Sequence, residues 1–161
     1  MSHEHLAEAL KPLCLKIIMI ETRYIEFDTK GDADMVDITQ MVVSAVRKSG
    51  MTDGIVVVFV PGATGAVTTI EYEPGLVADM RRALNRIAPE YEEYEHNRRW
   101  GDNNGHSHIR ASLLGPSITV PLVNGELALG RWQQIVFLDM DNRPRRRRLV
   151  LQILGEMRSG R

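Results

Sequence analysis

The chain has 161 residues, a length typical of one domain with a substantial hydrophobic core, and we expect residues 1–161 to form a single domain. With 43% apolar residues, 25% charged residues and a formal net charge of −1, it has no general electrostatic attraction to nucleic acid or anionic lipid. Cys14 is the single cysteine, which excludes an intramolecular disulfide and gives no sign of an oxidising compartment.

We also expect no targeting signal. The N-terminus lacks the basic and then apolar order of a signal peptide, and no apolar run approaches the roughly 18 residues of a membrane-spanning helix. We therefore expect a cytoplasmic protein that binds neither nucleic acid nor membrane. Residues 1–11 are predicted to form a short lead-in, where His3 and His5 could bind a metal only from a mobile terminus.

Most of the remaining chain has the patterns of β-strands. Apolar or alternating runs predict strands at 13–20, 23–28, 55–60, 66–72, 109–114, 117–122, 126–129, 134–139 and 149–154. The run at 55–60 is apolar on both faces, which is typical of a central strand covered on both sides. Asn124-Gly125 is a hairpin turn signal. Residues 90–105 have the composition of a loop.

Two segments have helical periodicity. Asp37 and Gln40 resemble a capping box, and apolar residues recur at helical spacing from there to Gly50. Pro74 suits the first turn of a second helix, which ends before Pro89. Two main helices among many short strands predict an α+β domain built mostly on antiparallel sheets.

Two carboxylates precede the second helix. Glu71 and Glu73 could share a strand face and hold a cation, or they could simply favour the N-terminus of the helix. Both interpretations remain open at this point.

A cluster of histidines makes the most specific chemical prediction. His96, Asp102, His106 and His108 lie close together in a segment rich in turn formers. If the backbone is extended at 105–110, His106 and His108 project from the same face, and both imidazoles reach one ion or one anionic group. Nitrogen and carboxylate ligands of this kind suit zinc, with magnesium as the alternative divalent metal. Solvated loop histidines are the plain alternative.

A block of arginines and a glycine turn are further candidates for binding an anion. In an extended chain, Arg143, Arg145 and Arg147 share one face while Arg146 and Arg148 share the other, so at most three guanidinium groups could converge on a phosphate. The plain alternative is a solvated strand entry. The turn at 61–65 could cradle an anion but lacks the lysine of a P-loop.

Three segments carry a resemblance to a known family. Tyr94-Glu95-His96 is followed by a segment from Asp102 to Gly115 and then by the distinctive Gly-x-Leu-x-Leu-Gly-x-Trp-Gln sequence within 125–133. Over about residues 13–156 the chain resembles the YjbQ-like family, many members of which carry the label secondary thiamine-phosphate synthase. The resemblance implies an α+β fold, a homotrimer, and a histidine-lined, metal-associated site near the subunit boundary.

The resemblance also assigns residues and marks a departure. The matching positions are His96, Asp102, His108 and the strand around Gln133, whereas His106 is found in only part of the family. The family commonly has a His-Thr-Ser/Thr-Ala stretch after the central strand, but this chain has Pro-Gly-Ala-Thr-Gly at 61–65, so the usual histidine is missing.

From these features we expect a metal-dependent enzyme that acts on a small phosphorylated molecule. The metal ligands would be His96, His106 and His108, leaving an open position for water or a phosphate oxygen. The catalytic groups would be Asp102, His106 and Arg110, and the substrate would contact Arg145, Arg147 and Gln133.

The resemblance implies thiamine-phosphate synthesis as the specific reaction. The main alternative is a non-enzymatic trimer that binds a metabolite or metal without turning it over. A phosphate-ester or cyclic-amide hydrolase is a third interpretation, since an activated water serves that chemistry as well.

Overall fold

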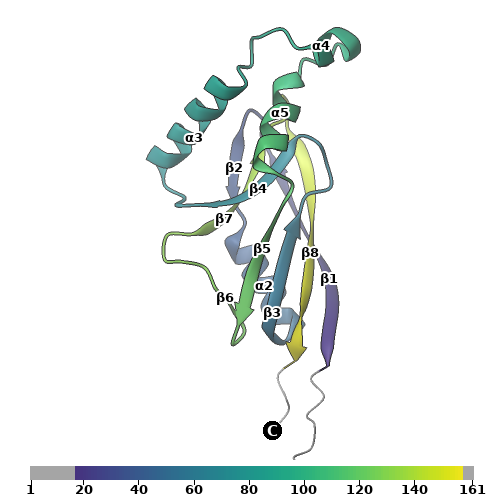
Figure 1. Cartoon of the computed structure of the whole chain (residues 1–161), viewed down its shortest axis with the longest axis vertical. Coiled ribbons are helices and arrows are strands. Elements are labelled where there is room, and N and C mark those ends of the chain that lie inside the picture. Colours follow the sequence, from purple (N-terminus) through teal and green to yellow (C-terminus); the bar gives the residue numbers. More distant parts are fainter. Residues whose placement is uncertain (1–16, 158–161) are drawn as a thin grey trace, which may run out of the picture.

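The computed structural model describes residues 17–157, so the predicted lead-in at 1–11, both N-terminal histidines and Cys14 lie outside the described residues. Two antiparallel sheets and four helices make up this part of the chain (Figure 1). The mixed α+β architecture with antiparallel sheets confirms the predicted fold class.

The larger sheet has the strand order β1-β8-β3-β5-β6, and the smaller sheet has the order β2-β7-β4. The strands are β1 (Ile18–Thr29), β2 (Asp34–Asp37), β3 (Met51–Phe59), β4 (Gly65–Ile70), β5 (Ser117–Val123), β6 (Glu126–Leu127), β7 (Gln134–Asp139) and β8 (Arg145–Met157). The helices are α2 (Thr39–Ser49), α3 (Pro74–Ile87), α4 (Glu95–Trp100) and α5 (Gly105–Leu114).

β1 and β8 pair along their whole overlap, from Ile18 opposite Glu156 to Thr29 opposite Arg145. The predicted strands at 13–20 and 23–28 are thus parts of one strand, as far as the described residues extend. β8 pairs with β3 on its other side. Within residues 17–157, β1 pairs only with β8, so its second side is an open edge of the larger sheet.

β7 lies between two hydrophobic cores and is buried on both of its faces. Ile135 and Phe137 face the core that α2 and the larger sheet share, whereas Val136 and Leu138 face the second core under α3 and α5. All four side chains are fully buried. The smaller sheet is therefore the middle layer of the domain, and its β7 end carries Asp139 into the interior.

The second core attaches α3 and α5 to the smaller sheet. Leu84 of α3 and Ala111 of α5 are buried there with Ile70 of β4 and with Met140, which directly follows β7. This packing fixes α5 against β4, while α4 buries none of its six residues and lies at one end of the molecule (Figure 1).

The predicted N-terminal cap is found in α3 but not in α2. Glu73 caps α3, where its carboxylate accepts from the backbone N–H groups of Gly75 at 2.7 Å and of Leu76, so the helix-start interpretation is confirmed. The capping box predicted for α2 is wrong. Asp37 instead accepts from the N–H and the hydroxyl of Thr39, at 2.9 and 2.5 Å, and Ile38 is the cap residue.

The prediction of a strand at 109–114 and a loop at 90–105 is also wrong. Residues 105–114 form α5, and residues 95–100 form α4. A short apolar run has no decisive period, and Arg110, Ala111 and Leu113 all favour a helix by intrinsic propensity. None of the helices within residues 17–157 is long and apolar enough to span a membrane.

Candidate functional site

The helical form of α5 separates the two histidines that an extended backbone would have brought together. Side chains two residues apart on an α-helix point in directions about 200° apart, because each residue turns the chain by about 100°. His106 is only 2% exposed and faces the interior, whereas His108 is partly exposed. The prediction that both imidazoles share one face is therefore wrong, and one ion cannot contact both from that face.

His108 meets His96 of α4 instead. Their ring centroids lie 4.5 Å apart with the rings tilted by 52°. Asp102, in the turn between α4 and α5, places Oδ2 at 3.3 Å from Nε2 of His96. Three of the predicted site residues, His96, Asp102 and His108, are thus brought together, and His106 is not.

Asn104 supplies the centre of this group, and the sequence patterns did not identify it. With its amide nitrogen turned toward the histidines, that nitrogen lies 3.1 Å from His96 Nε2 and 3.3 Å from His108 Nε2. The same nitrogen lies 3.1 and 3.2 Å from the two carboxylate oxygens of Asp102. An amide nitrogen has two hydrogens, so four potential acceptors compete for two donors. At the Asn104 amide nitrogen, the acceptor atoms therefore outnumber the hydrogens that can be donated to them.

This group does not yet have the arrangement of a closed metal centre. Among residues 17–157, no set of three His, Cys, Asp or Glu side chains is positioned to hold a metal ion as it stands. Asn104 occupies the point where the lone pairs of its neighbours converge, so a cation there would have to displace or rotate the Asn104 amide.

Several backbone contacts hold the turn that carries Asp102 and Asn104. Gly101 and Asn103 adopt left-handed conformations, with φ of 69° and 55°. Asn97 accepts the N–H of Gly105 at 2.8 Å, and a Cβ on Gly105 would lie 2.5 Å from Cβ of Tyr94, so only glycine fits at the start of α5. From across the fold, Asn142 donates to the Asp102 carbonyl at 2.8 Å.

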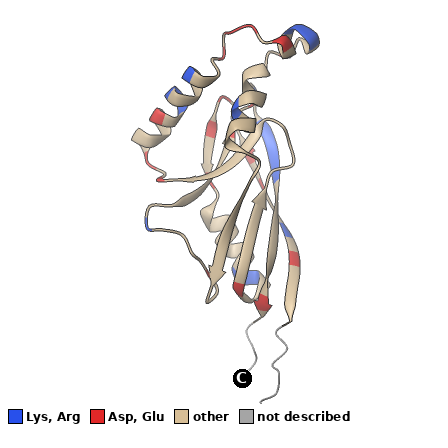
Figure 2. Cartoon of the chain, viewed as in Figure 1, with Lys and Arg blue, Asp and Glu red and all other residues tan. Residues whose placement is uncertain are grey.

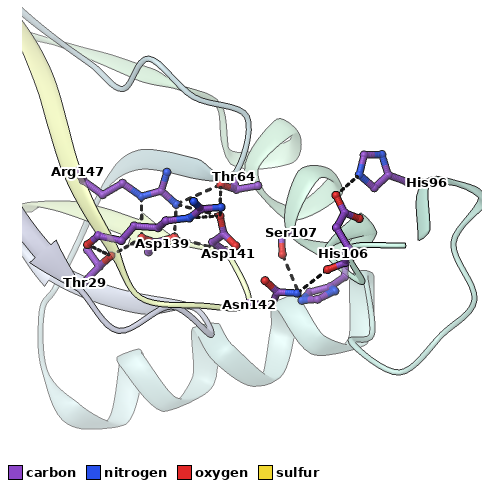
Figure 3. A network of polar contacts seen from close by, with 11 residues as sticks. Thr29, Thr64, His96, His106, Ser107, Asp139, Asp141, Asn142 and Arg147 are labelled. Atoms are coloured by element: carbon purple, nitrogen blue, oxygen red, sulfur yellow. Dashed lines mark hydrogen bonds and ion pairs between the residues drawn. The ribbon is translucent and has the colours of Figure 1, made fainter. Parts of the chain in front are cut away.

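The His106 side chain is enclosed by the protein interior and is not accessible to a ligand from solvent. Its Nε2 lies 3.3 Å from the Ser107 hydroxyl, its Nδ1 has no hydrogen-bond partner, and Tyr94 packs 6.3 Å from its ring. Burial, reinforced by the Arg110 guanidinium, lowers the pKa of His106, which favours the neutral imidazole. In Figure 3 the rings of His96 and His106 lie well apart.

Arg110, predicted to be catalytic, ties α5 to the end of α3. Its Nε donates to the Ala88 carbonyl at 2.9 Å and its Nη2 to Asn85 Oδ1 at 3.2 Å. Burial lowers the pKa of Arg110, since the guanidinium is largely removed from water. Arg110 follows His108 by two residues in the helix, so it lies on the opposite side of α5 from the histidine pair.

The inward-facing arginines of the basic block are bound to buried carboxylates. Arg147 contacts both oxygens of Asp139, with Nε donating at 2.7 Å, and Arg145 Nη2 lies 2.7 Å from Asp141 Oδ2 (Figure 3). Thr64 accepts from Arg147 at 3.1 Å and donates to Asp141 at 3.1 Å. The guanidinium edges predicted to bind a substrate phosphate are therefore already occupied by internal partners.

The outward-facing arginines confirm the predicted alternation. Arg146 pairs with Glu26 at 3.0 Å, and Arg148 lies 3.6 Å from the same carboxylate and 3.9 Å from the Tyr24 ring centroid. Figure 2 shows these basic residues along the first part of β8. Gln133, the third predicted substrate contact, accepts the Gly130 N–H at 2.7 Å in the connection before β7, which lies away from α4 (Figure 1).

The exposed surface beside the histidine pair includes two residues that sequence patterns did not single out. His96, Arg99 and Trp100 are spaced i, i+3 and i+4 in α4 and therefore lie on one side of that helix. Trp100 is 67% exposed, and the guanidinium of Arg99 lies 5.7 Å from its ring centroid. The i, i+3, i+4 spacing would have revealed them if the helix had been predicted.

The family model described as UPF0047 protein YjbQ-like matches residues 23–156, which include every element named above except the start of β1 and the end of β8. The chain belongs to this family. Its YjbQ-like relatives include a UPF0047 protein of Methanothermobacter thermautotrophicus, 37% identical over 143 residues that cover 89% of this chain and 98% of that protein. The UPF0047 protein YugU of Bacillus subtilis is 32% identical over 142 residues, which cover 88% of this chain and 99% of that protein.

Solved structures of YjbQ-like proteins support the same assignment. A protein of unknown function from Sulfolobus solfataricus matches with a TM-score of 0.83 and 31% identity over 87% of this chain and all of that one. An uncharacterised YjbQ/UPF0047 protein of Clostridium acetobutylicum matches with a TM-score of 0.72 and 36% identity. The match covers 80% of this chain and 98% of that one. The recognised family and fold are thus confirmed, and the reaction is left to the chemistry of the site.

Proposed function

We propose that the chain is a metal-dependent enzyme that acts on a small phosphorylated molecule, with the metal held by His96, Asp102 and His108. The observation that carries the proposal is the convergence of two imidazole nitrogens and a carboxylate on the single position that the Asn104 amide occupies. This set replaces the predicted His96, His106 and His108, because His106 points into the core.

The donor chemistry fits a divalent transition metal such as zinc. Two neutral imidazoles and one carboxylate are a common ligand set of catalytic zinc, in which a further position stays open. When bound, the cation would act as a Lewis acid and would lower the pKa of a coordinated water.

Arg99 and Trp100 supply the features that favour a phosphorylated substrate. Arg99 forms no ion pair with any residue in 17–157, so its guanidinium is available to a phosphate oxygen beside the histidine pair. Trp100 offers an exposed ring on which a planar group can pack. A phosphate near a metal and a ring on the tryptophan agree with thiamine-phosphate synthesis, which joins a pyrimidine diphosphate to a thiazole phosphate.

Self-association into a homotrimer is part of the same proposal. Within residues 17–157, no helix covers the outer face of the larger sheet, and this face exposes apolar side chains of β1 and β3 on either side of β8, among them Ile20, Ile55 and Phe59. A second copy packed on this face would bury them.

Metal content and turnover test the proposal in sequence. The purified protein should carry about one equivalent of metal by elemental analysis, and His96→Ala and His108→Ala should each lose it. His106→Gln is the matched control, because it removes an imidazole two residues from His108 and should retain the metal. If His96→Ala and His108→Ala both keep the full metal content, the proposed site is wrong.

Activity separates the enzyme from the binding protein. The metal-loaded protein should form thiamine phosphate from the pyrimidine diphosphate and the thiazole phosphate, and the His108→Ala variant should not. Stoichiometric metal with no product in that assay would favour the non-enzymatic trimer, and release of inorganic phosphate from phosphate esters would favour a hydrolase.

A further inference from the structure

A second candidate site lies on the other side of α5 from the histidine pair. A groove of about 290 Å³ runs between the turn after β1, the second half of α3 and the start of the segment that follows it, and Arg110 forms part of its wall. This volume is close to the lower end of the range for small-molecule sites, about 300–1,000 Å³. The groove contains charged side chains of both signs.

Arg110 offers this groove a fixed cation with unused donors. The residue is only 5% exposed, and its hydrogen bonds to the Ala88 carbonyl and to Asn85 hold the guanidinium in place. Those two contacts use one donor on Nε and one on Nη2, so the remaining N–H groups have no partner within residues 17–157. No carboxylate in this part of the chain lies within 4.0 Å of the guanidinium. An oxyanion would satisfy the unused donors.

Arg81 adds a second cation to the same groove. Its Nε donates to the Ala33 carbonyl at 3.3 Å, so the side chain lies across the turn after β1, and its other nitrogens have no partner within residues 17–157. Two guanidinium groups near one position are a typical arrangement for binding a carboxylate.

Two carboxylates also line the groove and have no direct partner. Asp32 and Glu90 form no ion pair or side-chain hydrogen bond within residues 17–157. Asp32 is fixed by the backbone: Gly31, Asp32 and Ala33 all have positive φ, at 79°, 52° and 56°, and the N–H of Asp32 donates to the Asp141 carbonyl at 2.7 Å. Non-glycine residues seldom adopt this conformation, and such backbone often marks a site where one side chain must be held in place.

These charges attract one another across the groove but form no direct ion pairs within it, and their mixture restricts the kind of ligand. A simple anion would be repelled by Asp32 and Glu90, and a simple cation would be repelled by Arg81 and Arg110. A molecule with one group of each sign would satisfy both sets. We propose that this groove binds a small zwitterion that carries a carboxylate and an ammonium group, as an α-amino acid does. Its carboxylate contacts the guanidinium groups, and its ammonium contacts the two acids.

The groove and the histidine pair can be tested separately. Arg110 and His108 project from opposite sides of α5, and neither His96 nor His108 lines the groove. Changes on the groove side should therefore leave metal content unaltered, and loss of the metal ligands should leave zwitterion binding intact.

The test uses the twenty L-α-amino acids as probes and the full chain as the binding protein. Chemical-shift changes of backbone amides at 31–33, 81–90 and 110 should identify at least one amino acid that binds. Its carboxamide, which lacks the carboxylate, and its N-acetyl derivative, which lacks the ammonium, should both bind at least tenfold more weakly.

Two exposed or half-exposed groove residues serve for mutation, because replacing Arg110 would also remove its hydrogen bonds to Ala88 and Asn85 at the end of α3. Glu90→Gln and Arg81→Gln should each weaken binding at least tenfold, whereas the matched surface controls Glu92→Gln and Arg86→Gln should not. The proposal is overturned if none of the twenty amino acids binds, if the N-acetyl derivative or inorganic phosphate binds as well as the amino acid, or if Glu90→Gln binds normally.

Discussion

Replacing Arg147 with methionine should destabilise the domain far more than the same change at Arg146, its neighbour in β8. Arg147 contacts both oxygens of Asp139, and its side chain is 12% exposed while that of Asp139 is fully buried. Methionine keeps a long apolar stem in the same place, so the main effect is the loss of the guanidinium. The Asp139 carboxylate would then remain in the interior without a cation.

The expected cost follows from what remains around that carboxylate. Removing one partner of a buried ion pair costs about 3–5 kcal/mol of unfolding free energy. Asp139 would keep the Thr29 hydroxyl and the N–H of Asp141, at 3.0 Å, as hydrogen-bond donors, so we expect about 3 kcal/mol. For a domain of this size, that is a fall in melting temperature of roughly 6–12 °C.

Arg146→Met provides the comparison, because its pair with Glu26 is exposed, with side-chain exposures of 71% and 43%. Exposed pairs contribute about 0–1 kcal/mol. Urea denaturation of both variants, followed by circular dichroism, gives the two free energies. The double variant Arg147→Met, Asp139→Leu should recover part of the loss, since it removes the unpaired charge. Equal costs for the variants at 146 and 147 would refute the assignment of Arg147 to an internal network.

Three further changes test other parts of the fold. Gly105→Ala should cost about 1–3 kcal/mol of unfolding free energy in urea denaturation, because its new Cβ would lie 2.5 Å from Cβ of Tyr94. Glu73→Ala should cost about 1 kcal/mol by the same measurement, since it removes the cap of α3. The pKa of His106 is lowered in the folded state, so the unfolded chain binds its proton first: the unfolding free energy of metal-free protein should decrease as the pH falls below about 6.5, the ordinary value.

Matched variants show whether each effect has the stated cause. Gly62→Ala should be nearly neutral, because its Cβ would meet only Arg147 Nη1 at an ordinary 3.7 Å. His106→Gln should flatten the pH dependence of stability measured between about pH 5 and 7, since that interval lies around the ordinary histidine pKa. An unchanged slope in His106→Gln would assign the pH dependence to other groups.

Much of the sheet structure could be predicted from local patterns. The apolar run at 134–139 and the alternation of arginines from 145 to 148 both appear in the structure as β7 and the start of β8, because a period of two is a property of the strand itself. The acids that bind these arginines could not be derived in the same way. Asp139 and Asp141 belong to a strand of the other sheet and to the connection that follows it, so their contacts depend on how the two sheets pack.

The sequence suggested a group of site residues but predicted the wrong backbone for the segment that carries two of them. His96, Asp102 and His108 are close in the sequence, and their side chains also lie close together in the structure. The error was the backbone at 105–110, since the five residues after Gly105 have no periodicity that distinguishes a strand from a helix. Turning that segment into α5 moved His106 into the core and brought Asn104, at the helix start, between the histidines.

The open edge of β1 also affects how the chain behaves in concentrated solution. Backbone N–H and C=O groups along this edge have no strand partner within residues 17–157, and Ile18 and Ile20 beside them are largely exposed. Such an edge can template the addition of a strand from another molecule. The acids of β1 do not protect this edge by repulsion, because Glu21 pairs with Arg23 and Glu26 pairs with Arg146 and Arg148 of β8. High protein concentration should therefore favour aggregation through the exposed edge of β1.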